Sequence, residues 1–271
     1  MPPTPKPCAA SVRGLLDPPG TPGGAVRLRL VPLTVCFALL LARHHDCLWT
    51  IPTGDQASGL WLEAIFLHET RFDYARLRFQ EQTPAQGGAS VYVHSVLPTL
   101  IAMLYDAAPS PAWAFLAYHV FTIFCAAVIV WLLYEAVAQV ASGPTAALAA
   151  AFLATWPPFA LQISLLGMEI PMTALAFLAT VLAAQERYLP AAAAGFFACA
   201  MKITALLATG VLLGAVAFLA IVRLRRRDRA GAARAAAGAL AFLIVVGSWS
   251  AIQSTWRMSH LDFRMVFTPA P

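Results

Sequence analysis

The chain has 271 residues, of which 60% are hydrophobic and only 11% are charged, and the apolar residues come in long runs. This composition exceeds the apolar content of a soluble domain and predicts an all-α polytopic membrane protein. The formal net charge of +5 arises from basic clusters within residues 6–29 and 223–234, which suit the anionic cytoplasmic face of a membrane. No nucleic-acid-binding motif accompanies them, so we exclude binding to DNA or RNA. The five scattered cysteines match neither a disulfide framework nor a zinc site.

The first 29 residues are rich in proline and contain Gly20, Gly23 and Gly24. Such a segment does not bury a core, so we expect a disordered, basic cytoplasmic tail. Residues 30–51 follow as the first predicted span. Its late polar residues, Arg43 to Asp46, should lie near the outer interface or face protein.

Residues 53–107 hold many of the titratable side chains and predict an outer-face loop with juxtamembrane helices. The stretch GLWLEAIFL has apolar residues at helical spacing and predicts a short amphipathic helix on the membrane. Residues 91–107 are apolar but contain His94, Pro98 and Asp106. This segment is short for a span and is expected to lie in the outer leaflet or to re-enter from it.

Six further apolar runs predict spans at residues 113–134, 145–165, 170–184, 189–201, 203–222 and 235–252. The basic tail and the basic run 223–234 should both be cytoplasmic, which requires an even number of crossings between them. Omitting residues 91–107 from the spans satisfies this rule. The prediction is therefore about seven transmembrane helices, with the N-terminus cytoplasmic and residues 253–271 an outer-face tail.

The same topology brings Asp55, Glu169 and Lys202 to the outer face. Asp55 and Glu169 stand where a carboxylate caps a helix or complements its dipole, and Lys202 stands where a lysine snorkels to the headgroups. The functional alternative is one shared site, in which Asp55 accepts a proton and Lys202 holds a phosphate as a point charge. His94 is a weaker substrate-binding candidate, because a lone interfacial histidine is usually structural.

The chain resembles the GT-C glycosyltransferase superfamily, in the bacterial branch related to protein O-mannosyltransferases and aminoarabinose transferases. The resemblance covers about residues 28–225 and rests on the order GDQASGLWLEAIFL, VYVHSVLPTLIAMLY, WPPFALQISLLGMEIPM and LPAAAAGFFACAMKITALL. It departs from the family pattern where Gln56 replaces a second acid, where a double proline is reduced to Pro98, and where Glu169 stands for the usual Asp.

The resemblance implies that residues 30–252 form a glycosyltransferase-like transmembrane domain in the bacterial inner membrane. It would transfer a hexose or pentose, with inversion, from a polyprenyl-phosphate donor to a lipid, glycan or protein acceptor. Asp55 would be the general base, while Glu169, Lys202, His94 and Glu63 would bind substrate. A divalent cation is allowed, but no ligand set is named.

Two matters stay open. Family members continue through further spans, so a chain that ends at Pro271 is either a short or a truncated member. The alternative function is a non-catalytic membrane module, either half of a transporter or an inactive relative that binds lipid.

Overall fold

The computed structural model describes the backbone of residues 24–51, 60–72, 96–138, 140–202 and 204–260, and the side chains of all of these except 24–30 and 252–260. Every regular element in these ranges is a helix, which confirms the all-α prediction. The elements are α1 (Gly24–Arg43), the 3-10 helix η2 (His45–Cys47), α2 (Leu62–Glu69), α4 (Val96–Ala107), α5 (Pro111–Ala138), α6 (Gly143–Thr155), α7 (Pro157–Ser164), α8 (Glu169–Ala184), α9 (Tyr188–Met201), α10 (Ala205–Arg225) and α11 (Arg229–His260).

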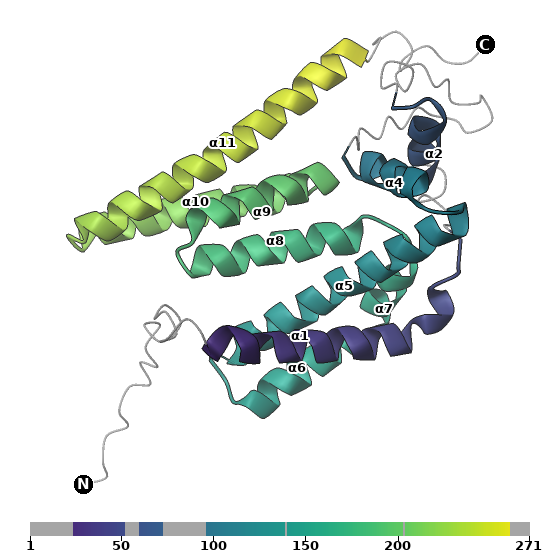
Figure 1. Cartoon of the computed structure of the whole chain (residues 1–271). Coiled ribbons are helices and arrows are strands. Elements are labelled where there is room, and N and C mark those ends of the chain that lie inside the picture. Colours follow the sequence, from purple (N-terminus) through teal and green to yellow (C-terminus); the bar gives the residue numbers. More distant parts are fainter. Residues whose placement is uncertain (1–23, 52–59, 73–95, 139, 203, 261–271) are drawn as a thin grey trace.

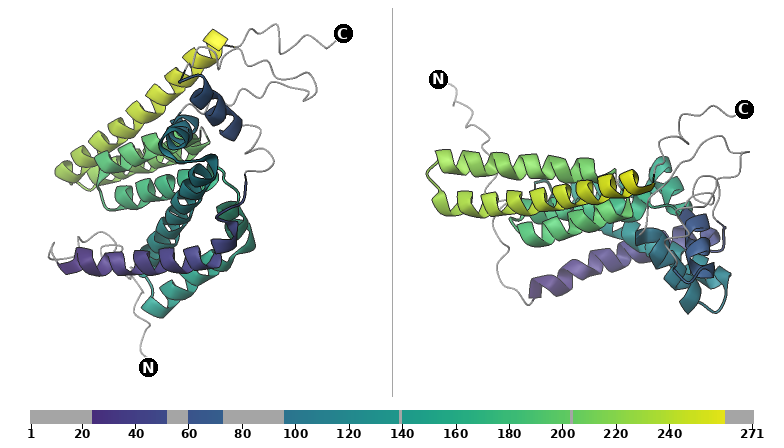
Figure 2. Two further views of the ribbon diagram at one scale, coloured as in Figure 1. Left: turned by 45° about the vertical axis from the view of Figure 1, so that its right-hand side comes forward. Right: turned by 90° about the horizontal axis from the view of Figure 1, so that it is seen from above.

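The long helices pack side by side as a bundle (Figures 1 and 2). Helix α8 packs on α9, and α10 and α11 pack on each other and on α9. Helix α5 joins this group to α1 and α6. The short helices α2 and α4 contact each other at one end of the bundle, where α7 leads into α8 and α9 leads into α10 (Figure 1).

The bundle therefore has two distinct ends. At one end, which we call the basic end, the α8–α9 connection lies against the last turns of α10. Arg223 there donates a hydrogen bond to Glu186 at 3.1 Å. At the opposite end, which we call the α2/α4 end, the indole of Trp61 bonds to the carbonyl of Leu166 before α8. The topology predicted from the sequence likewise separates the basic run 223–234 from Glu169 and Lys202.

Three helical segments within the described residues are long and apolar enough to cross a membrane: Pro111–Ala138, Ala205–Arg225 and Arg229–Ala251. The bent pair α6 and α7 adds a fourth if it counts as one span. Large apolar side chains are exposed on the outside of these helices, including Leu148 at 72%, Leu207 at 78% and Phe218 at 68%. Lipid contact explains such exposure, so these findings are consistent with a multi-pass membrane protein.

The span predicted at residues 145–165 is two helices that meet at 56°. Pro157 and Pro158 begin α7, and Trp156 before them is extended, with φ −62° and ψ 123°. Proline lacks the N–H that would continue α6 and disfavours helical backbone in the residue before it. The break therefore follows from the Trp-Pro-Pro sequence.

Two other boundaries differ from the sequence prediction. Helix α1 begins at Gly24, within the predicted tail, and ends at Arg43, where the polar residues pass into η2 instead of completing a span to residue 51. Helix α4 has 12 residues and rises only about 18 Å, too little for a bilayer core of about 30 Å. Residues 91–95 of the segment predicted not to span lie outside the described residues.

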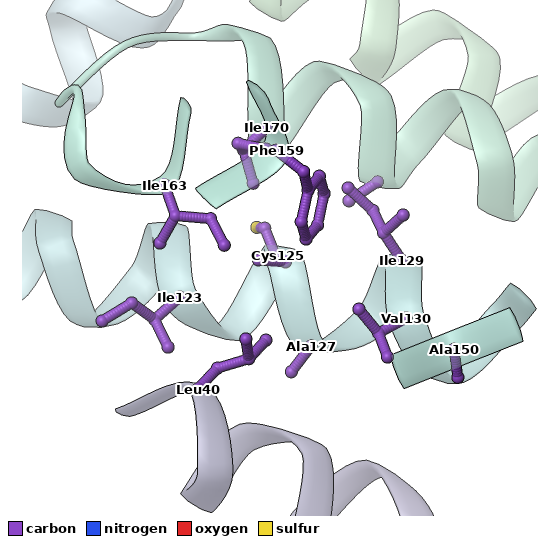
Figure 3. Close-up of a cluster of buried hydrophobic side chains, with 12 residues drawn as sticks. Leu40, Ile123, Cys125, Ala127, Ile129, Val130, Ala150, Phe159, Ile163 and Ile170 are labelled. Atoms are coloured by element: carbon purple, nitrogen blue, oxygen red, sulfur yellow. The ribbon is translucent and has the colours of Figure 1, made fainter. Parts of the chain in front are cut away.

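The central core forms around α5 (Figure 3). Ile123 and Val130 of α5 are buried together with Leu40 of α1, Phe159 of α7 and Ile170 of α8. One helix thus holds the first half of the chain against the second. This packing fixes where α8 begins, and hence the position of Glu169.

Candidate functional site

An ion pair joins the start of α8 to the end of α9 at the α2/α4 end of the bundle. The Nζ atom of Lys202 donates a hydrogen bond to Oε1 of Glu169 at 2.6 Å. Glu169 is the first residue of α8, and Lys202 is the extended residue at which α9 stops, with φ −153° and ψ 131°. The structure therefore brings together two residues that are 33 positions apart in the sequence.

Both members of the pair are partly accessible. The side chains of Lys202 and Glu169 are 26% and 33% exposed. The second carboxylate oxygen of Glu169 is buried and has no hydrogen-bond partner among the described residues. A carboxylate accepts several hydrogen bonds and an ammonium donates three, so the pair has unused capacity for a polar ligand.

Two buried side chains fix the loop that precedes Glu169. The Nε1 atom of Trp61 donates to the carbonyl oxygen of Leu166 at 3.0 Å, and the hydroxyl of Tyr118 donates to the carbonyl oxygen of Gly167 at 2.8 Å. Trp61 and Tyr118 are each 1% exposed. These bonds satisfy backbone carbonyls that no helix satisfies, and they hold the first turn of α8 in place.

Trp61 leads into α2, which carries Glu63. The short helix predicted here is present, and its residue Ala64 is buried in a cluster with Leu97 and Ile101 of α4. Oε2 of Glu63 is buried without a hydrogen-bond partner in the described part of the chain. Burial raises the pKa of the Glu63 carboxyl to about 8, so this group is mostly protonated at neutral pH.

A hydrogen-bonding contact between two polar side chains links α2 to α4. Nδ1 of His68 lies 2.6 Å from Oδ1 of Asp106, and the ring of Tyr105 lies 5.7 Å from the His68 ring. The His68 and Asp106 side chains are 38% and 51% exposed. The sequence does not predict this contact, because neither residue stands in a motif and 38 residues separate them.

Asp55 and His94, the proposed base and a proposed substrate contact, lie outside the described residues. The described neighbours of Asp55 in the sequence are Ile51 and Leu60. Leu60 belongs to the buried cluster that also contains Leu166 and Met201. Of the five predicted site residues, the structure thus places Glu169 and Lys202 in contact and Glu63 on α2, which packs on α4.

No group of three or more histidine, cysteine or acidic side chains that could hold a metal ion occurs in the part of the chain that the structure describes. The neighbouring histidines His44 and His45 show why. His44 is 6% exposed, whereas the His45 side chain points to solvent with Asp46, at 67% and 86% exposure. His44 and His45 therefore do not share a face, although His45 and Asp46 contact each other, with Nε2 3.0 Å from Oδ1.

The site combines a carboxylate and a cation that touch, a nearby buried carboxyl that holds its proton, and loop carbonyls fixed by two aromatic donors. Such a set can bind an anionic, hydroxyl-rich ligand, because Lys202 supplies positive charge and the two acids supply hydrogen-bond acceptors and one donor. Comparisons of the chain with protein-family models, with curated proteins and with solved structures found no match.

Proposed function

We propose that this protein is a membrane glycosyltransferase of the GT-C type. It moves a hexose or pentose from a polyprenyl-phosphate donor to an acceptor at the outer face of the bacterial inner membrane. The observation that carries the proposal is the Lys202–Glu169 ion pair, which lies where α8 begins and α9 ends. Together with the resemblance in motif order, it supports a site for a lipid-linked phosphate.

The depth of the pair supports a lipid-linked ligand. Helix α9 has 14 residues and rises about 21 Å, whereas the hydrocarbon core is about 30 Å thick. With the basic end at the inner interface, Lys202 lies short of the outer interface by roughly 9 Å. A cation at that level needs a partner, and the phosphate of a polyprenyl donor approaches from the lipid side.

The proposed topology uses the arrangement of the helix ends. Arg223, near the end of α10, donates a hydrogen bond to Glu186 between α8 and α9 at the basic end, which the positive-inside rule assigns to the cytoplasm. Seven crossings follow if α8, α9 and the apolar part of α1 also span. These segments are shorter than the three long spans, so the bilayer would thin locally or flanking polar side chains would snorkel.

In the proposed reaction, Asp55 accepts the proton of the acceptor hydroxyl. The hydroxyl oxygen then attacks the anomeric carbon, and the bond between that carbon and the phosphate oxygen breaks. The leaving polyprenyl phosphate gains one negative charge, which Lys202 stabilises by a charge-assisted hydrogen bond. A single displacement of this kind inverts the anomeric configuration.

The two other acids would position the sugar. Glu169 accepts hydrogen bonds from sugar or acceptor hydroxyls through its free oxygen, and protonated Glu63 donates one. His94 contributes a further polar contact in this proposal. The acceptor is a lipid, glycan or protein.

One observation favours the second candidate, a non-catalytic membrane module. Lys202 and Glu169 already neutralise each other, so the pair stabilises the α8–α9 contact without any ligand. In that case no donor would be consumed, and loss of the pair would affect folding alone.

The direct test uses membranes that contain the full chain and polyprenyl phosphate carrying a radiolabelled hexose or pentose. We expect the labelled polyprenyl-phosphate donor to be consumed faster than in membranes without the chain. A Lys202→Met/Glu169→Gln variant, which removes both charges together, is the matched control and should be folded but inactive. Donor turnover at the background rate by folded wild-type protein would favour the non-catalytic candidate.

A further inference from the structure

An open cavity of about 610 Å³ lies at the basic end of the bundle, at the opposite end from the Lys202–Glu169 pair. It is bounded by the start of α9 and by α11. Arg187 and Arg234 contribute to its lining from these two elements, and Pro190, Ala237 and Ala241 add apolar surface. The cavity therefore combines positive charge with an apolar wall.

The positive charge at the cavity is only partly compensated by protein. Glu186 also lines the cavity and forms a long ion pair with Arg234, but Arg223 donates to both of its carboxylate oxygens. The Arg223 hydrogen bonds hold the pKa of the Glu186 carboxyl below its usual range, so this acid is ionised but already occupied. Arg234 lies 3.9 Å from it, beyond hydrogen-bonding distance, and is 70% exposed. Arg187 has no ion-pair partner within the described residues.

The neighbouring segment of the chain is also positively charged. The segment 223–234 contains six arginines and one acid, Asp228. Asp228 accepts a hydrogen bond from the backbone N–H of Gly231 at 2.9 Å, which caps the start of α11. Its carboxylate is therefore directed to the helix and is not a free counter-charge for Arg187 or Arg234.

A buried hydroxyl at the cavity also has no partner. Tyr188 lines the cavity and is only 7% exposed, yet its hydroxyl oxygen is buried without a hydrogen bond to any described residue. Its ring packs closely on Gly238, since a Cβ atom at that position would lie 2.4 Å from the Tyr188 ring. Helix α9 also begins here without a capping side chain, which leaves its first N–H groups for an anion.

The apolar wall indicates an amphiphilic ligand. Leu189 beside the cavity is 76% exposed, and Leu240 on α11 is 57% exposed. Both are lipid-facing in a membrane-embedded bundle. A small soluble phosphate would use the arginines but leave this apolar surface uncovered, whereas a phospholipid covers both parts.

We propose that this cavity binds the phosphate headgroup of an anionic glycerophospholipid, with Arg187 and Arg234 holding the phosphate and one acyl chain lying along Pro190, Ala237 and Ala241. The site is on the cytoplasmic leaflet in the proposed orientation. It depends on embedding in a membrane, and not on the glycosyltransferase function.

The test uses the full chain purified in detergent and titrated with phosphatidylglycerol, with bound lipid counted by native mass spectrometry. Each arginine near a phosphate contributes about fivefold to affinity, so Arg187→Gln/Arg234→Gln should weaken binding on the order of 25-fold. The matched control is Arg226→Gln/Arg229→Gln, which removes the same charge from the same end but not from the cavity lining. It should weaken binding much less.

Two further arms decide the outcome. Ala237→Trp keeps all charges and fills the cavity, so it should also abolish binding. Inorganic phosphate at millimolar concentration should not displace the lipid, and phosphatidylcholine should bind weakly. Equal losses in both double variants, full binding by Ala237→Trp, or displacement by phosphate alone would each overturn the proposal.

Discussion

Replacing Lys202 by methionine separates the structural role of the ion pair from its proposed role in donor binding. The change leaves the Glu169 carboxylate partly buried without its cation. Exposed ion pairs contribute about 0–1 kcal/mol, and breaking a fully buried pair costs about 3–5 kcal/mol. With side chains 26% and 33% exposed, Lys202→Met should lower the free energy of unfolding by about 1–3 kcal/mol.

A double-mutant cycle in detergent measures this effect. Glu169→Gln alone should destabilise the protein as well, because it leaves Lys202 unpaired. The double variant should regain much of the loss, giving a coupling energy of about 1 kcal/mol or more. Asp46→Asn is the matched control, since Asp46 is 86% exposed and its change should stay within about 0.5 kcal/mol.

Donor binding should behave differently from stability in the same variants. The double variant regains stability but still lacks the cation, so its affinity for a polyprenyl-phosphate sugar should fall at least tenfold, as expected for a lost charge-assisted bond. Additive stability changes would refute the contact between the two residues. Unchanged donor affinity would limit the pair to a structural role.

Three further results are expected. Glu63→Gln should stabilise the protein relative to wild type, and more so at pH 8 than at pH 5. Folding raises the pKa of Glu63 from 4.5 to about 8, so the folding stability of the wild type falls as the pH rises between these values. A pH-independent difference in thermal unfolding would contradict this. Ser110→Cys, between α4 and α5, should react with an impermeant thiol reagent in intact cells, and Ala230→Cys only after permeabilisation; the reverse pattern would overturn the orientation. Gly238→Ala should lower the unfolding temperature because its Cβ has no room, whereas Gly214→Ala, with open space around it, should not; equal effects would contradict the close α9–α11 contact.

The sequence predicted the helical architecture and several boundaries well. Glu169 was expected at the start of a helix, where α8 begins, whereas residues 145–165 were predicted as one span and are two helices that break at Pro157 and Pro158. These are local effects of backbone chemistry, which neighbouring residues determine. The early end of α1 at Arg43 also has a local cause, the polar residues that follow it.

The contacts between distant segments could not be predicted in this way. Nothing local indicates that Lys202 touches Glu169, that His68 lies against Asp106, or that one carboxyl oxygen of Glu63 is buried. Each depends on how α5 and the α7–α8 loop pack, which sums many weak apolar contacts. Topology reasoning placed Glu169 and Lys202 on one face, but only the packing gives the 2.6 Å separation.

The most direct test of the central claim compares sugar transfer by wild-type protein and by Asp55→Asn in the same membranes. Asparagine caps a helix about as well as aspartate, so the variant should keep its yield and its thermal stability in detergent. It does not accept the proton, so the rate of transfer from the polyprenyl-phosphate donor should fall by roughly 10²- to 10⁴-fold. Full transfer by a folded Asp55→Asn protein would contradict the assignment of Asp55 as the base and move that role to Glu63 or Glu169.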